Sequence, residues 1–456
     1  MITMVIKALK NGWQQQWATI NVFPLVVFRI VFGLLMAFAL LRMEYFGWID
    51  AHLINPEFHF SYWGFEWVQP LGYWGTHGLV AVGVLSALGI ATGFRYRLSA
   101  ILFFVSWTYL SLIDKTWYLN HYYFVSLVSF ILMLISPHHF CSLDVYFRRV
   151  QPDHLVQSWQ VNSLRLMLGM VYFFAGVAKI KGDWLWEAQP LKIWLQARTD
   201  LPVIGGAFDW FWVPYFFCWA GMFYDLLIPF GLSNRKSRPF AYVAVVVFHV
   251  MTWLLFNIGV FPWVMIASTL IFFTAEDWAA WSNIRRFIPK NSQAQPLKGR
   301  QQWIVAILLP FFALQIFLPL RHFLMSGNVL WTEQGYRYAW HVMLMEKNGH
   351  CTFIVKDEET DARWEVLPRQ YLLPAQEQQM AFQPDMILEF AHFLGEVYRK
   401  KGVREPVVTV EAYASLNGRR SRLLIDPQVN LMETKDLLWG NDWILPLESA
   451  ALVAKR

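Results

Sequence analysis

The sequence predicts an α-helical polytopic membrane protein of about nine transmembrane helices, followed by a small extracytoplasmic α+β domain rich in β-strand. Three observations support this fold class. Of the 456 residues, 56% are hydrophobic and only 15% are charged, whereas soluble domains carry about 25% charged residues. Long apolar runs recur through the first two-thirds of the chain. After that, charges become frequent and strand-like alternation replaces the apolar runs. The predicted membrane domain is therefore 1–320, and the predicted extracytoplasmic domain is 321–456.

Nine segments approach the roughly 20 apolar residues that a spanning helix needs. They lie near residues 23–41, 77–94, 98–113, 121–136, 161–179, 212–231, 239–257, 260–275 and 303–320. The eighth segment is short and contains Pro262, so a re-entrant segment is an alternative to a full span there.

Basic residues mark every second loop between these segments. Lys7 and Lys10 precede the first segment, and the loops after the second, fourth, sixth and eighth segments are basic and poor in acids. The positive-inside rule places such loops in the cytoplasm, so nine spans put the N-terminus inside and the C-terminal domain outside. These loops also account for the net charge of +6 without a nucleic-acid partner. The lack of an Asn-x-Ser/Thr sequon favours a bacterial inner membrane.

The C-terminal third has the pattern of a small α+β domain. Alternation predicts three strands, at Tyr338–Glu346, Cys351–Asp357 and Arg363–Leu367. Pro384–Lys401 has the spacing of an amphipathic helix. Val407–Leu416 and Arg419–Ile425 flank Asn417-Gly418, a pair that suits the type I′ turn of a hairpin.

Lys179 is the first candidate for chemistry, because it ends an apolar segment. The preceding residues are apolar apart from the hydroxyl of Tyr172. Burial there disfavours an ammonium and would leave a neutral amine available as a base. A lysine that snorkels to the interface is the alternative. Ala175 and Gly176, one turn earlier, would let another helix or a flat ligand approach closely.

A second polar group falls on the same outer side, at the start of the fourth segment. Asp114 is a candidate cap or counter-ion, and Asn120 a candidate helix N-cap. His121 is a candidate donor or acid/base group near neutral pH, with a capped interface histidine as the alternative.

Asp225 and His249 lie within the sixth and seventh segments. We expect them to pair or to line a cavity, with a purely structural polar network as the alternative. Asn257 follows on the outer side, near Gly259 and Pro262, which would break a helix. Broken backbone at this depth is tolerated where it lines a cavity.

Several familiar kinds of site are absent from the sequence. The three cysteines have neither metal-ligand spacing nor a disulfide pattern. No P-loop, dinucleotide-binding glycine pattern, His-Glu-x-x-His motif or Ser/His/Asp set occurs. The residues alone therefore predict a membrane protein with a polar site near the outer leaflet and no metal.

Four blocks of the sequence resemble, in the same order, the vitamin K-dependent γ-glutamyl carboxylase family in its bacterial form. They are Asp114-Lys-Thr-x-x-x-Asn120-His121, Tyr172-Phe-x-Ala-Gly-Val-x-Lys179 with Asp183-Trp184, His249 through Phe256-x-Ile-Gly-x-Phe261 to Met265, and Gly335-Tyr336-x-Tyr-x-Trp340 through to Ile425-Asp-Pro427. Together they extend over roughly residues 110–430.

The resemblance implies a reaction. Vitamin K hydroquinone, or menaquinol, is deprotonated and reacts with O2. The oxygenated quinone removes a γ-proton from a glutamyl residue, and the carbanion captures CO2. The implied products are γ-carboxyglutamate and the quinone epoxide. Lys179 takes the position of the initiating base and His121 that of a group assisting the glutamate step. Asn120, Tyr172, Phe261 and Met265 take positions that line the quinone pocket.

The implied partner is a glutamate-containing peptide or protein that arrives from water, beside the lipid bilayer. Met345, Lys347 and Gln428 stand where the animal enzymes carry other residues. We therefore expect other side chains to meet the substrate glutamate. These candidates are Tyr336, Arg337, Trp340, Arg419, Arg420 and Arg422. An ordinary solvated hairpin face is the alternative for the arginines.

Two other functions stay open at this point. A quinol epoxidase without carboxylation would still need Lys179. A non-catalytic quinone-binding or transport protein belongs to another class. Transporters often show internal repeats, and none is detectable in this sequence.

Overall fold

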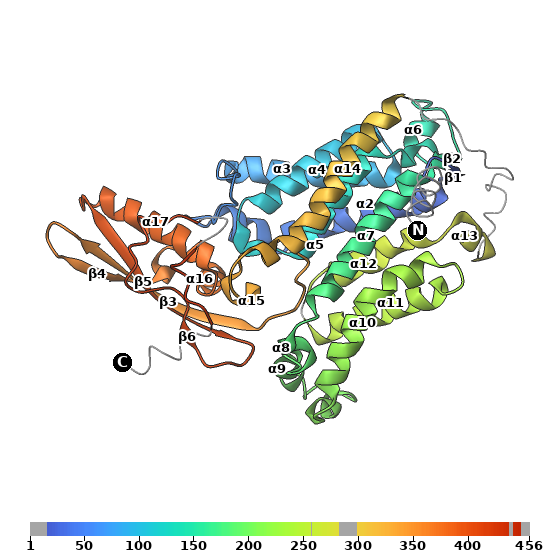
Figure 1. The fold of residues 1–456 in the computed structure, drawn as a ribbon. Coiled ribbons are helices and arrows are strands. Elements are labelled where there is room, and N and C mark those ends of the chain that lie inside the picture. Colours follow the sequence, from blue (N-terminus) through green and yellow to red (C-terminus); the bar gives the residue numbers. More distant parts are fainter. Residues whose placement is uncertain (1–15, 257, 282–298, 437–440, 448–456) are drawn as a thin grey trace, which may run out of the picture.

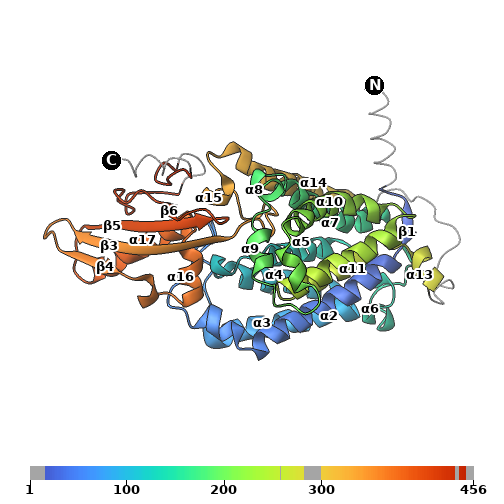
Figure 2. The ribbon, with the colours of Figure 1, turned by 90° about the horizontal axis from the view of Figure 1, so that it is seen from below.

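The computed structural model describes residues 16–256, 258–281, 299–436 and 441–447. A long helical bundle carries a sheet-containing domain at one end (Figure 1). At the other end, the short strands β1 (Thr19–Asn21) and β2 (Leu155–Gln157) pair antiparallel. The view from below shows the same separation of β1 from the C-terminal sheet (Figure 2). The described chain therefore enters the bundle at one end and leaves it at the other.

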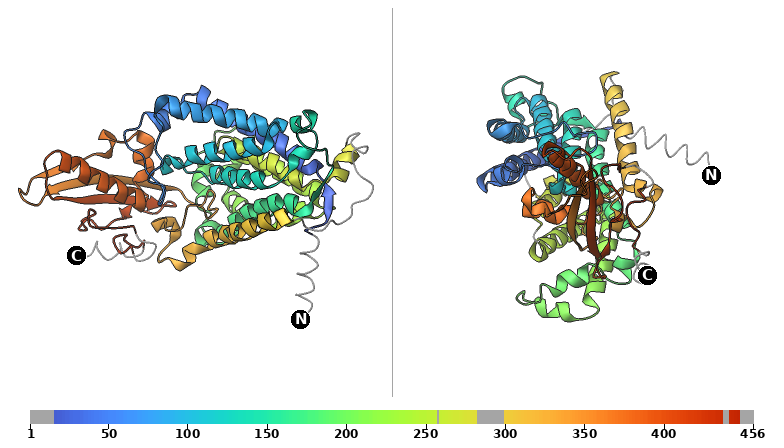
Figure 3. Two further views of the ribbon diagram at one scale, coloured as in Figure 1. Left: turned by 90° about the horizontal axis from the view of Figure 1, so that it is seen from above. Right: turned by 90° about the vertical axis from the view of Figure 1, so that its left-hand side faces the viewer.

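Each of the nine predicted apolar segments contains a helix. In chain order these are α2 (Phe23–Tyr45), α3 (Gly72–Thr92), α4 (Tyr96–Leu112), α5 (Asn120–Leu134), α7 (Ser158–Ala178), α10 (Val213–Ser233), α11 (Arg238–Leu255), α12 (Phe261–Ser268) and α14 (Gly299–Leu320). Within the described ranges, six helices are long and apolar enough to cross a membrane. They are α2, α3, α7, α10, α11 and the segment Trp303–Leu324, which contains most of α14. The yellow-orange α14 lies at the edge of the bundle (Figure 3, right), and only 17% of its most apolar stretch is buried.

The prediction of nine spans is not confirmed, because the other three helices are short. Helix α4 has 17 residues and α5 has 15. Helix α12 has 8 residues before it tightens into the 3-10 turn η5 (Thr269–Phe272). At a rise of 1.5 Å per residue, a helix the length of α5 measures about 22 Å, against about 30 Å of bilayer hydrocarbon. Length and composition therefore support six membrane-spanning helices in the part of the chain that the structure describes.

A glycine lets two helices that carry the candidate site pack closely. A Cβ atom at Gly176 of α7 would lie 2.9 Å from the backbone nitrogen of Leu226 in α10. Only a residue without a Cβ allows this approach. Lys179 follows one turn later, so its side chain meets Asp225 of α10 directly.

The C-terminal domain is built on an antiparallel sheet with the strand order β4–β3–β5–β6. The strands are β3 (Lys347–Asp357), β4 (Arg363–Val366), β5 (Pro406–Leu416) and β6 (Arg422–Leu423). Helix α17 (Pro384–Lys400) packs on this sheet, with the ring of Phe390 5.1 Å from that of Phe353 in β3. The amphipathic helix and the two strands predicted at Cys351–Asp357 and Arg363–Leu367 are thereby confirmed.

The predicted hairpin is confirmed at its turn and shorter than predicted in its second strand. Asn417 and Gly418 have φ values of 51° and 76°, as a type I′ turn requires. Strand β6 covers only Arg422–Leu423 of the predicted Arg419–Ile425.

The predicted strand Tyr338–Glu346 is wrong. The segment belongs to an irregular stretch before β3, here called the connecting loop (residues 335–346). Tyr338, Trp340 and Met343 have φ values of 64°, 58° and 53°. Left-handed residues interrupt an extended backbone, so the alternating sequence does not form a strand here.

Partly buried ion pairs join the C-terminal domain to the bundle. The Lys115 ammonium, in the 3-10 turn η2 (Lys115–Trp117), lies 3.0 Å from Asp385 and 2.8 Å from Glu389 of α17. Arg337 of the connecting loop lies 2.7 Å from the same Asp385. Burial alone would raise the pKa of the Asp385 carboxyl, but Arg337 and Lys115 hold that pKa well below its usual range. These contacts cross the predicted domain boundary and fix the two parts relative to each other.

Candidate active site

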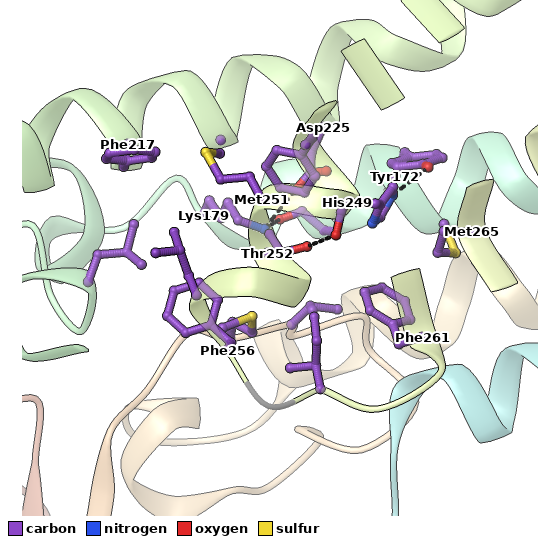
Figure 4. Close-up of a pocket in the computed structure, with 18 of the residues that line it drawn as sticks. Tyr172, Lys179, Phe217, Asp225, His249, Met251, Thr252, Phe256, Phe261 and Met265 are labelled. Atoms are coloured by element: carbon purple, nitrogen blue, oxygen red, sulfur yellow. Dashed lines mark hydrogen bonds and ion pairs between the residues drawn. The ribbon is translucent and has the colours of Figure 1, made fainter. Parts of the chain in front are cut away.

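An apolar chamber lies between α7, α10, α11 and α12 (Figure 4). Six of the predicted site residues line it: Tyr172, Lys179, Asp225, His249, Phe261 and Met265. The structure therefore brings together residues that are distant in the sequence and lie on separate helices.

Lys179 and Asp225 form a buried pair in the wall of the apolar chamber. The Lys179 side-chain nitrogen Nζ lies 2.7 Å from Asp225 Oδ2 and donates at 3.3 Å to the carbonyl of Ala175. Both residues are only 5% exposed, so Lys179 does not reach the surface by snorkelling. Its amine also lies 5.4 Å from the centre of the Trp184 ring. The carboxylate supplies the countercharge that a buried ammonium needs.

His249 and Tyr172 form a second polar pair on the same wall. The Tyr172 hydroxyl and His249 Nε2 are 3.0 Å apart, with donor and acceptor set by the histidine tautomer. His249 is buried, and its Nδ1 has no hydrogen-bond partner within the described residues. An unpaired polar atom in an otherwise apolar pocket suits a flat ligand that carries oxygen atoms, such as a quinone.

A second, polar chamber of about 620 Å³ lies beside the first. Asn120, His121, Tyr336 and Arg337 line it. The two chambers share one layer of side chains, Ile258, Phe261, Val342 and Met343. An apolar compartment and a polar compartment thus meet at a thin wall.

Phe261 lies between the histidines of the two chambers. Its ring centre is 5.4 Å from that of His121 and 5.6 Å from that of His249. The Lys179 side of the site and the His121 side are therefore about one aromatic ring apart at this point.

Asn120 is held in one orientation by a chain of hydrogen bonds. The Tyr118 hydroxyl donates to Asn120 Oδ1 at 3.0 Å, and Asn120 Nδ2 donates to the carbonyl of His341 at 3.2 Å. Tyr118 in turn accepts from the backbone nitrogen of Tyr338 at 2.7 Å. The connecting loop thereby fixes the residue next to His121.

Sequence reasoning missed Tyr118, Trp184 as a wall residue, and the contribution of Val342 and Met343. The last two were hidden by the prediction of a strand at Tyr338–Glu346, which would have placed them in the sheet. Trp184 directly follows Asp183 at the end of the second family-like sequence block, and that position was the available signal.

The predicted substrate-glutamate residues divide into two groups. Tyr336 and Arg337 line the polar chamber, with Arg337 paired to Asp385. The others lie elsewhere. Trp340 is fully buried and stacks 5.3 Å from Tyr123, and Arg420 is exposed on the hairpin.

Arg419 and Arg422 already have partners within the protein. Arg419 makes a bidentate pair with Asp183 at 2.7 and 2.8 Å. Arg422 donates to the carbonyl of Leu447 at 3.1 Å. The hairpin arginines thus serve contacts inside the fold.

The hydrogen bonds of Asp114 indicate a structural role. It caps η2 by accepting from the Thr116 backbone nitrogen, and it accepts from Gln376 Nε2 of the C-terminal domain, both at 2.8 Å. Burial raises the pKa of this carboxyl to about 6. Asn257 lies outside the described residues. In the described ranges, no three His, Cys, Asp or Glu side chains are grouped in a way that could hold a metal ion.

Comparison with known families covers both parts of the chain. Residues 17–278 match the family described as the HTTM domain. Residues 300–450 match the family described as the vitamin K-dependent gamma-carboxylase, lumenal domain. The first match contains Lys179, His121 and the lining residues of the apolar chamber up to Met265, and the second contains the connecting loop and the sheet. No solved structure matches the chain.

Proposed function

Since the chain belongs to the vitamin K-dependent gamma-carboxylase family, we propose that it γ-carboxylates glutamate residues of a protein substrate while it epoxidises a reduced quinone, using O2 and CO2. One observation carries this proposal. The buried Lys179–Asp225 pair faces an apolar chamber, and a single layer of side chains separates that chamber from the polar one that contains His121.

We assign to Lys179 the role of the base that accepts a proton from the hydroquinone. A hydroquinone hydroxyl is far less acidic than a carboxylic acid, so the reaction needs a strong base. Asp225, at 2.7 Å, stabilises the ammonium that forms when Lys179 takes the proton.

We assign to Tyr172 and His249 the role of holding a quinone oxygen farther along the same wall of the chamber. His249 Nδ1, which has no hydrogen-bond partner among the described residues, provides the contact. The contact between the Tyr172 hydroxyl and His249 Nε2 holds the imidazole ring in one orientation. Phe261 and Met265 offer apolar surface to the ring system. The bound quinone supplies the oxygen chemistry, and the apolar walls keep water away from it.

We assign the glutamate step to the polar chamber. His121 lies at its boundary with the apolar chamber, and Asn120 is oriented beside it by Tyr118 and the His341 carbonyl. A glutamyl side chain would enter from water on the side of the C-terminal domain. The quinone would enter its chamber from lipid.

The cellular setting follows from the same division. The chain is an integral membrane protein whose C-terminal part is extracytoplasmic, as the apolar helices and the lumenal-domain match indicate. We propose a bacterial inner membrane with the N-terminus in the cytoplasm, on the basis of the loop charges.

The test is an assay of the purified protein with vitamin K hydroquinone, O2, labelled bicarbonate and a glutamyl peptide. We expect quinone epoxide and labelled peptide to form together, and menaquinol assayed in parallel identifies the preferred quinone. Epoxide without labelled peptide would select a quinol epoxidase. Neither product, from folded protein, would overturn both enzymatic functions.

A further inference from the structure

The polar chamber contains a cation without a partner. Of the cations that line it, Lys115 and Arg337 are paired with carboxylates of α17. The third, Arg42, belongs to the last turn of α2. Its guanidinium makes no ion pair or hydrogen bond with any residue that the structure describes, and it lies 5.6 Å from the centre of the Phe46 ring.

Among the described residues, the other cations at or near the chamber have carboxylate partners: Lys115, Arg337 and Lys347 pair with Asp385, Glu389 and Glu333. Arg42, whose side chain is exposed, is the lining cation that forms no such pair with a described residue. A glutamyl side chain would bring one negative charge, whereas a glutaminyl side chain would bring none.

Arg42 and His121 line the same chamber, and so does Tyr122, which follows His121 directly in α5. Trp48 and Trp117 line the same chamber, with ring centres 5.6 Å apart. These rings offer apolar surface to the methylene groups of a side chain whose carboxylate reaches Arg42.

We propose that Arg42 binds the carboxylate of the substrate glutamyl side chain and sets the specificity for glutamate. This assignment rests on the proposed function and extends it to the recognition of the substrate. The γ-carbon of glutamate is bonded to the carboxylate carbon, so a carboxylate held by Arg42 also positions the C–H bond that reacts. When that proton leaves, negative charge spreads into the carboxylate, and a guanidinium with two parallel donors binds this form more strongly. Both KM and kcat then depend on Arg42.

The test measures carboxylation of a glutamyl peptide by Arg42→Gln and Arg42→Lys. We expect kcat/KM for the peptide to fall about 100-fold or more in Arg42→Gln. Arg42→Lys recovers part of this loss, since an ammonium keeps the charge without the planar pair of donors. The KM for quinol and the binding of quinone to the purified variant stay at their wild-type values. Arg363→Gln, which changes an exposed arginine of β4, is the matched control and leaves all three quantities unchanged.

A competition assay tests specificity separately. A glutaminyl peptide inhibits the wild-type protein far less than a second glutamyl peptide does, and Arg42→Gln loses this difference. Wild-type kcat/KM in Arg42→Gln, or an equal loss of quinone binding and peptide carboxylation, would overturn the assignment while the proposed function stands. A wild-type protein that forms neither product overturns the proposed function instead.

Discussion

At the scale of single residues, the Lys179–Asp225 pair makes a graded prediction for its two members. Lys179→Met removes the base, and quinone epoxide and labelled peptide are both lost. Asp225→Asn keeps the amine but removes the countercharge 2.7 Å away, so the ammonium that forms when Lys179 takes a proton is less stable. We expect the maximal rate of epoxide formation to fall by about 100-fold, while quinone binding stays at its wild-type value.

The measurements are the rate of epoxide formation by Asp225→Asn and the binding of quinone to the folded variant. The control is Asp209→Asn, which alters an exposed carboxylate in the 3-10 turn before α10. A wild-type rate of epoxide formation in Asp225→Asn would show that this carboxylate does not act on the base.

Tyr118 carries a second prediction at this scale, as a positioning residue. Tyr118→Phe removes the hydrogen bonds to Asn120 Oδ1 and from the Tyr338 backbone nitrogen. Each such bond contributes about 0.5–1.5 kcal/mol, so we expect kcat for carboxylation to fall by roughly tenfold while the KM for quinol stays constant. Tyr413→Phe, on the exposed side of β5, is the matched control. If Tyr118→Phe lowered thermal stability and left kcat unchanged, the tyrosine would be structural only.

The sequence identifies individual residues of the site better than their pairing. Lys179, Asp225 and His249 stand out because charged or titratable groups in apolar segments are costly. The sequence does not reveal the contact between Lys179 and Asp225, because 46 residues separate them and the contact depends on how α7 packs against α10 at Gly176. Arg42 stands at the end of an apolar segment, where a lysine or arginine is ordinary. Its lack of a partner becomes visible only in the folded chain.

At the scale of elements, local rules succeed where the structure itself is local. The Asn417-Gly418 turn and the amphipathic helix α17 follow from neighbouring residues, and both are present. The same local rules do not predict the connecting loop. Its left-handed residues are Tyr338, Trp340 and Met343 rather than glycines, so residue type gives no sign of the backbone that forms there. Contacts with Tyr118 and Tyr123 of the bundle hold that backbone in place.

The hairpin makes the prediction that belongs to this scale. Its Arg419 and Asn417 both bond to Asp183, four residues after Lys179. Burial alone would raise the pKa of Asp183, and the bonds from Arg419 and Asn417 lower it overall. We expect Arg419→Gln to reduce the free energy of unfolding by about 1.5–3 kcal/mol at neutral pH. Arg420→Gln, which alters the exposed neighbour, is the control.

The pH dependence of that loss has a definite sign. A carboxyl whose pKa is lowered in the folded state contributes stability above its unfolded pKa of about 3.9, and the contribution disappears as the pH falls through the folded value. The difference in the free energy of unfolding between wild type and Arg419→Gln should therefore be largest near neutral pH. It should shrink as the pH falls below about 3.9. Thermal unfolding in detergent at neutral and acidic pH measures it. A difference that grows in acid would contradict the ion pair.

At the scale of the whole molecule, the ends of the described chain bear on the number of crossings. Strand β1 and the C-terminal sheet lie at opposite ends of the bundle (Figures 1 and 2). A chain that enters at one end and leaves at the other passes along the bundle an odd number of times. Six long helices give an even number, so at least one shorter helix must cross as well. We propose that α4, α5 and the α12–η5 segment all cross, which restores nine.

Two reporter fusions separate nine crossings from six. Alkaline phosphatase, which is active only outside the cytoplasm, is fused after Asn234 in one variant and after Leu447 in another. If α11, α12–η5 and α14 all cross, these two points lie on opposite sides of the membrane. If α12–η5 does not cross, they lie on the same side. The basic residues Arg235, Lys236 and Arg238 place the first point in the cytoplasm. We therefore expect an inactive fusion after Asn234 and an active one after Leu447. Equal activity of the two fusions at comparable expression would show that the α12–η5 segment turns back within the membrane. The proposed arrangement, in which Lys179 and the substrate glutamate meet on the outer side, would then be wrong.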